Sequence, residues 1–340
     1  MIKLVEIAQQ VIKEGGKAFG DRAKRMTTSE MHVVFNELKD KIGKYFGKFE
    51  IAKSLPSKES HGDLDIVTLN DKGLNIFEFL KQQYGDAIED TLKSGNVNSF
   101  LFRSQSLGKS VHVDILTTGS EEDFNPQYEY LSYGDFSGIL GVMSRRLRYN
   151  YGTLGFFKIF EDKRKQYHYI LITKDLREGL KILGFESVMG EFDNIQTNDD
   201  VVKFISSSPL FDSDYYKNMM LNNSDRKRCR IGRKSADEIR NKLSSMNKHR
   251  SIEDNDHFLK KLYPNYYKNL QREIEKIENV VVITKKYTGD WILQNFPQIK
   301  PGKVINQIKT YWKSLYNDNI DGVPEETLKQ VTQNYINSLK

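Results

Sequence analysis

The run His61-Gly62-Asp63-Leu64-Asp65-Ile66-Val67-Thr68 is followed about fifty residues later by Val111-His112-Val113-Asp114-Ile115-Leu116. Both runs predict β-strands. Because successive side chains of a strand point to opposite faces, Asp63 and Asp65 share one face of the first strand, away from Leu64 and Ile66. In the second strand Asp114 lies on the face opposite Val111, Val113 and Ile115. Pairing of the two strands would therefore bring three carboxylates together.

Carboxylates this close repel one another unless a cation neutralises them. Ligation by oxygen alone suits Mg²⁺, with Mn²⁺ as the alternative. Three carboxylates can hold two ions, the arrangement that activates a hydroxyl and stabilises a leaving oxygen in phosphoryl transfer. Asp63, Asp65 and Asp114 are thus the candidate metal ligands and catalytic residues. The alternative is that Asp63 and Asp65 are solvated residues at the end of a strand.

The composition favours a folded protein. The chain has 340 residues, 38% of them hydrophobic, with 19 Phe and 18 Tyr, enough for two or three domains. The single cysteine, Cys229, excludes a disulfide framework and a cysteine-based zinc site. No apolar run has spanning length and the first residues lack a signal sequence, so we expect a soluble, intracellular protein without membrane contact.

Positive charge is concentrated in one segment. Residues 226–250 hold ten Lys or Arg against two acidic residues, a local balance of 10 − 2 = +8, whereas the whole chain carries +6. Such a segment is typical of proteins that bind a phosphate backbone, although a solvated basic helix would look the same. The candidate nucleic-acid-binding residues are Arg226, Lys227, Arg228, Arg230, Arg233 and Lys234.

The order of predicted elements indicates an α+β fold. Thr27 and Glu30 form a capping box before a helix that ends near Gly47, and a strand follows at 49–52. After the Asp63/Asp65 strand come a helix at about 74–84 and a hairpin of strands 97–103 and 110–116. We therefore expect a small mixed sheet with flanking helices, followed by a mainly helical C-terminal region.

Residues 27–187 resemble the catalytic core of the DNA polymerase β-type nucleotidyltransferase superfamily, most closely its family X DNA polymerases. The resemblance lies in Gly62-Asp63-Leu64-Asp65 on the first strand and Val111-His112-Val113-Asp114 on the second. It implies that Asp63 and Asp65 bind both Mg²⁺ ions. It also implies that Asp114 completes the catalytic ion's ligands and helps to deprotonate the 3′-hydroxyl that attacks a nucleoside triphosphate.

The resemblance also suggests nucleotide-binding residues and domains. Phe136-Ser137-Gly138 is similar to the turn that packs on the incoming sugar in family X, although Phe136 is equally well explained as a core residue. The implied nucleotide-binding set is Lys53, Ser54, Ser57, Lys58, Gly62, Phe136, Ser137, Gly138, Arg145 and Arg148. The implied division is an N-terminal extension (1–26), a nucleotidyltransferase palm (27–125), a thumb-like nucleotide-binding subdomain (126–190) and a basic helical C-terminal domain (191–340).

Two features complicate this interpretation. Where the family has a Gly-Ser turn that cradles the triphosphate, this chain has Ala52-Lys53 or the run Ser54 to Ser57, so Lys53 and Lys58 would have to supply charge instead. In addition, residues 287–322, with Pro301-Gly302 before a stripe of Val304, Ile308, Trp312 and Leu315, are similar to the end of bacterial tRNA CCA-adding enzymes and poly(A) polymerases.

Three functions therefore remain as expectations. The first is a nucleotidyltransferase that adds nucleotides from a (d)NTP to the 3′-hydroxyl of DNA or RNA by two-metal phosphoryl transfer. The second is an RNA or tRNA 3′-end enzyme of the CCA- or poly(A)-adding type, or one acting on a small molecule or protein. The third is a nucleic-acid-binding protein with a degenerate site. Retention of three carboxylates favours an active enzyme.

Overall fold

A computed structural model of the chain describes residues 18–228, 231–287, 289–299, 302–316 and 323–338. It is an α+β protein whose C-terminal region is mainly helical, as the sequence predicts. It divides into a first unit (Met1–Phe157 with Leu171–Leu262) and a second unit (Lys158–Ile170 with Tyr263–Lys340). The boundaries expected at residues 125 and 190 both fall inside the first unit.

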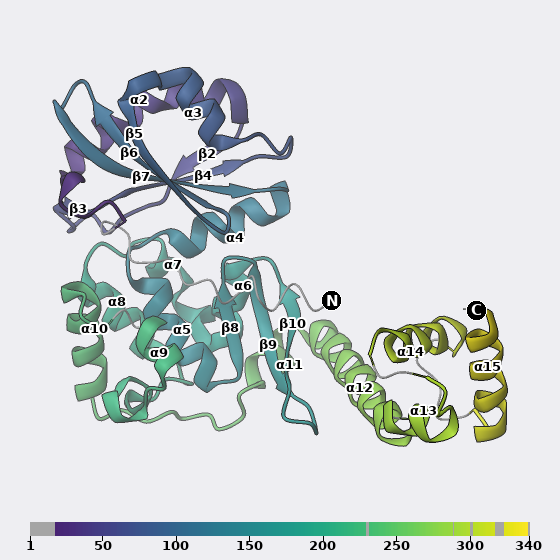
Figure 1. The fold of residues 1–340 in the computed structure, drawn as a ribbon. Helices are drawn as coiled ribbons and strands as arrows, with labels where there is room; N and C mark the ends of the chain where they lie inside the picture. The colour runs from purple at the N-terminus through teal and green to yellow at the C-terminus, as the bar shows by residue number, and fades with distance from the viewer. Residues whose placement is uncertain (1–17, 229–230, 288, 300–301, 317–322, 339–340) are drawn as a thin grey trace. The chain divides into compact units, whose positions relative to one another are not determined.

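The first unit begins with a five-stranded mixed sheet of order β2-β4-β7-β6-β5 (Figure 1). β4 pairs in parallel with β7, and the other neighbouring strands are antiparallel. The bounds are β2 Phe49–Ile51, β4 Leu64–Leu69, β5 Ile88–Ser94, β6 Val97–Ser104 and β7 Lys109–Thr118, with a separate two-residue pair of β1 Met26–Thr27 and β3 Ser60–His61. The predicted hairpin is thus β6-β7.

Helices α2 (Thr28–Phe46) and α3 (Ile76–Tyr84) cover one face of this sheet (Figure 1). Their apolar side chains, among them Val34, Leu38 and Leu80, are fully buried against Leu64, Ile66, Val111, Val113 and Ile115 of the two central strands. Burial of this apolar surface is the main force that fixes which face of each strand turns inward. Helix α4 (Glu121–Leu131) lies on the opposite face.

The remainder of the first unit is largely helical. Its helices are α5 Phe136–Arg146, α6 Leu176–Leu180, α7 Met189–Phe192, α8 Asn198–Ser207, α9 Asn223–Arg228, α10 Lys234–Ser245 and α11 His257–Leu262. A three-stranded sheet of order β10-β9-β8 is formed by β8 Tyr149–Gly152, β9 Gly155–Glu161 and β10 Tyr167–Thr173, of which residues 158–170 are assigned to the second unit. The described residues contain no helix long and apolar enough to cross a membrane.

The second unit contains α12 Pro264–Lys286, α13 Gly289–Asn295, α14 Lys303–Tyr316 and α15 Glu325–Ser338. Its core includes Ile308 and Trp312, and the Trp312 indole donates a hydrogen bond of 2.8 Å to the buried hydroxyl of Thr332. The expected apolar stripe of α14 is correct at these two positions and at Val304, which packs against the same core. It is wrong at Leu315, which is 47% exposed and outside that core.

The capping box predicted from Thr27 and Glu30 is present. The backbone N–H of Glu30 donates to Thr27 Oγ1 at 3.2 Å, and the backbone N–H of Thr27 donates to Glu30 Oε2 at 2.8 Å. Glu30 also pairs with Lys109 Nζ at 2.7 Å, and these contacts together lower the pKa of Glu30. The cap therefore ties the start of α2 to the first residue of β7.

We expect Thr27→Ala to destabilise the protein by about 1 kcal/mol, the usual effect of removing an N-cap hydroxyl. The midpoint of urea unfolding should fall without a change in the dependence of unfolding free energy on urea, since the surface exposed on unfolding is unchanged. An unaltered midpoint would show that the cap adds nothing to the packing of α2.

Candidate metal centre

The parallel pairing of β4 and β7 sets the positions of the carboxylates. Asp65 lies directly opposite Asp114 in the register, and Leu64 lies opposite Val113. Since Leu64 and Val113 point into the α2/α3 core, Asp65 and Asp114 point to the other face of the sheet. Asp63 comes two residues before Asp65, just ahead of β4.

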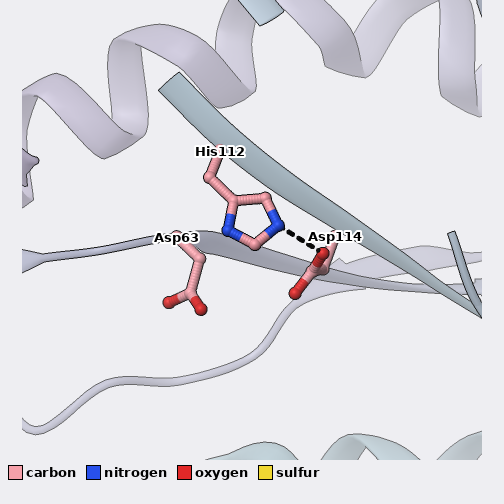
Figure 2. Close-up of side chains that lie close together, drawn as sticks. All are labelled: Asp63, His112 and Asp114. Atoms are coloured by element: carbon pink, nitrogen blue, oxygen red, sulfur yellow. Dashed lines mark ion pairs between the residues drawn. The ribbon is translucent and has the colours of Figure 1, made fainter. Parts of the chain in front are cut away.

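A histidine that the sequence pattern did not single out belongs to the same cluster. His112 is two residues before Asp114, so the same alternation places both side chains on one face of β7. Ligand atoms of Asp63, His112 and Asp114 all lie within 4.8 Å of one another. Figure 2 shows the imidazole of His112 beside Asp114, with Asp63 nearby on the segment just ahead of β4. Asp65 is not a member of this compact group.

His112 and Asp114 are in close contact inside the protein. His112 Nε2 is 2.8 Å from Asp114 Oδ1, and the two residues are 1% and 4% exposed. The distance is that of an ion pair, so His112 is the partner of this carboxylate oxygen when no ion is bound. A buried carboxylate oxygen is normally hydrogen-bonded or bound to a cation, so a metal ion could share this atom with His112.

Burial and charge shift the ionisation of the cluster. Burial raises the pKa of Asp63, and the negative charge of Asp114 raises it further, against the opposing effect of His112, Lys58 and Arg233. Burial alone would lower the pKa of His112, but its contact with Asp114 and the charges of Asp63 and Asp65 outweigh that effect and raise the pKa. The cluster therefore carries an excess of negative charge that a cation would relieve.

Two basic residues extend this cluster. Lys58, which was predicted to bind nucleotide, and Arg233, which belongs to the basic segment, are both near enough to act on the charge of Asp63. Arg233 is half-buried and its guanidinium is 3.7 Å from Asp135 Oδ1. Positive side chains beside a carboxylate cluster are suited to bind the phosphates of a nucleotide.

The segment that replaces the family's Gly-Ser turn is held by its backbone. The backbone N–H of Lys53 donates to Ser132 Oγ, and the backbone N–H of Tyr133 donates to the Lys53 carbonyl. The ammonium of Lys53 lies 5.9 Å from the centre of the Tyr133 ring. Ser54 and Gly62 are partly exposed and Ser57 is exposed. None of these residues belongs to the group of candidate metal ligands.

The proposed sugar-binding turn is a helix start in the structure. Phe136, Ser137 and Gly138 are the first residues of α5, and all three are buried. The ring of Phe136 is fully buried, 5.4 Å from Phe192 and 5.8 Å from Phe204 between ring centres. The expectation of a turn is wrong. Packing of these aromatic rings supports the alternative that Phe136 is a core residue. Arg145 is partly exposed near the end of α5 and Arg148 is exposed just beyond it.

The basic residues of the segment 226–250 differ in whether they are paired with neighbouring side chains or exposed. Several of its cations are engaged locally: Arg240 donates to Asn218, Lys242 pairs with Asp199 and Glu238, and Arg250 pairs with Glu253. Arg226, Lys227 and Lys234 are exposed. The side chain of Arg228 and the whole of Arg230 lie outside the described residues. The charge available to a polynucleotide is therefore smaller than the number of basic residues in the sequence suggests.

A second group in the described residues could also hold a metal ion. It contains Asp212, Asp214 and His249. Asp214 is already paired with Lys217, which lowers the pKa of Asp214, and the side chain of His249 is 62% exposed. Two of the three side chains of the β4/β7 cluster are buried, so that cluster is the better candidate.

We expect Asp63→Asn to stabilise the protein in the presence of a chelator. A raised pKa means that ionising Asp63 opposes folding, and this destabilisation grows as the pH rises from the ordinary Asp range of about 4. The thermal midpoint at pH 7.5 should therefore rise by about 2–4 °C, as on the order of 1 kcal/mol produces in a domain of this size. The gain should disappear near pH 4. Asp71→Asn, at an exposed position after β4, is the matched control. An equal or lower midpoint for Asp63→Asn would contradict the charge balance described here.

No model of a known protein family matches the chain, and no curated protein is similar to it in sequence. The likeness to polymerase β-type nucleotidyltransferases therefore rests on the residues of β4 and β7 themselves. Both carboxylate strands lie in one sheet, in parallel and in register.

Proposed function

We propose that the protein is a metal-dependent nucleotidyltransferase that adds nucleotides from a (d)NTP to the 3′-hydroxyl of a nucleic acid. The observation that carries the proposal is the in-register pair of Asp65 and Asp114 on parallel strands, with ligand atoms of Asp63 and Asp114 within 4.8 Å of each other. A structural role for this cluster is disfavoured, because clustered negative charge lowers stability and raises the pKa of Asp63.

The proposed roles of the residues follow from the chemistry of their side chains. Asp63, Asp65 and Asp114 supply the oxygen ligands for Mg²⁺ or Mn²⁺, and two such ions activate a hydroxyl and stabilise the leaving oxygen in phosphoryl transfer. Lys58 and Arg233 supply positive charge near Asp63, where they would bind the triphosphate in place of the missing Gly-Ser turn. The ion pair with Asp135 helps to keep the Arg233 guanidinium near Asp63.

The choice between deoxyribose and ribose substrates is left open by this geometry. Burial of Phe136 in an aromatic cluster removes the sugar contact that the sequence suggested, and with it any screening of ribose from deoxyribose by this ring. The RNA or tRNA 3′-end alternative is therefore as compatible with the site as the DNA-polymerase-like one. Assays have to include all eight nucleotides and both kinds of acceptor.

We expect incorporation of labelled nucleotide into a DNA or RNA 3′ end in the presence of Mg²⁺ or Mn²⁺, and none with a chelator. Single-stranded, gapped and tRNA-like acceptors should be compared. Asp65→Asn should lower the rate by at least about 100-fold, since the loss of a metal site removes several kcal/mol of transition-state stabilisation. Asp71→Asn should leave the rate unchanged. Full activity of Asp65→Asn would refute the site, and inactivity with every acceptor would favour the degenerate binding protein.

The exposed part of the basic segment makes a separate prediction about binding. Replacing both Arg226 and Lys227 with Ala should weaken polynucleotide affinity for all sequences alike. The slope of log affinity against log salt should flatten by roughly 0.7–0.9 for each phosphate that is no longer neutralised. The control replaces Lys81 and Lys93, two exposed lysines of α3 and β5. If both double variants show the same slope as the unmodified protein, the segment is a solvated surface.

A further inference from the structure

His112 pairs with Asp114 in the candidate metal centre, but neither the carboxylate pattern nor the proposed reaction gives it a role in metal binding. It is 1% exposed, and a histidine is seldom buried this deeply without a specific partner. Its ring packs edge to face with Phe19, with 5.1 Å between ring centres and planes at 84°. Val111 and Val113 on either side point into the core. The imidazole is therefore held among the carboxylates by packing.

The distances fit one ion shared by three side chains. Ligands bound at about 2.0–2.2 Å to the same small divalent cation are at most about 4.4 Å apart. The candidate atoms of Asp63, His112 and Asp114 lie within 4.8 Å of one another before any ion draws them together. A shift of roughly a few tenths of an ångström would bring them into range. Asp114 Oδ1 lies 2.8 Å from His112 Nε2, so the two atoms face the same space.

We propose that His112 is a direct nitrogen ligand of one metal ion at this centre, together with Asp63 and Asp114. The inference deepens the proposed function, on whose site it rests. A nitrogen donor changes the choice of metal, because Mg²⁺ prefers an all-oxygen set whereas imidazole binds Mn²⁺ and later transition metals more readily. This ion should therefore be Mn²⁺ in preference to Mg²⁺, in contrast to the Mg²⁺ expected from the carboxylates alone.

The test measures binding and needs no activity. Protein labelled with ¹⁵N in its histidines is loaded with one equivalent of Mn²⁺, and the hyperfine coupling between the metal and nitrogen is recorded by pulsed electron paramagnetic resonance. We expect a ¹⁵N coupling of the size given by a coordinated imidazole. It should vanish in His112→Gln and persist in His32→Gln, whose histidine is exposed on α2. His112→Asn replaces His112→Gln if the latter does not fold.

Competition between the two metals gives a second reading. The unmodified protein should need a large excess of Mg²⁺ to displace Mn²⁺. In His112→Gln the ratio of Mn²⁺ affinity to Mg²⁺ affinity should fall by roughly 10–100-fold, the range by which metal affinity drops when a residue that supports a metal site is removed. An unchanged preference would count against nitrogen ligation.

The outcomes separate this inference from the proposed function. Mn²⁺ that binds the unmodified protein but not Asp63→Asn, without any histidine coupling, would refute the role of His112 and leave the carboxylate site standing. Failure of the unmodified protein to bind Mn²⁺ or Mg²⁺ would refute both. Nucleotide transfer with Mg²⁺ alone, at a rate unaffected by His112→Gln, would refute the inference and support the function.

Discussion

The placement of Asp65 opposite Asp114 across the β4–β7 pair is the constraint on which the candidate site depends. Two carboxylates directly opposite each other oppose the pairing of their strands. The pairing is maintained by the apolar residues on the reverse face, where Leu64, Ile66, Val113 and Ile115 are fully buried beneath α2 and α3. The hydrophobic core thus holds together a polar cluster that would not assemble by itself.

The local features of this arrangement could be predicted from the sequence. The capping box of Thr27 and Glu30, the alternation along β4 and β7 and the β6–β7 hairpin all involve residues that are neighbours in the chain or obey a short period. His112 was within reach of the same reasoning, because the alternation that places Asp114 on one face also places His112 there. The spacing of the six histidines along the chain does not mark it as a ligand, because its neighbour Asp63 in the cluster comes from a distant segment of the chain.

The long-range features could not be predicted. Phe136 lies next to Phe192 and Phe204, which are 56 and 68 residues later in the chain, and only that packing distinguishes a core ring from one that touches a ligand. Arg233 acts on Asp63 from the far end of the first unit's sequence. Likewise, some cations of the basic segment are paired and others exposed only because the fold brings Asp199, Asn218 and Glu253 next to the paired ones.

The strand order also has a consequence for how the chain folds. β7 is the last of the five strands in sequence, yet it lies between β4 and β6. Until β7 inserts, the inner edges of β4 and β6 have no partner and can pair with other chains. The pairing of β4 with β7 joins residues about fifty positions apart, and such pairings are slow to form. The sheet should therefore depend on rapid insertion of residues 109–118 during synthesis. A ribosome paused before this segment has been released would hold a nascent chain with two open sheet edges and without His112 and Asp114 beside Asp63.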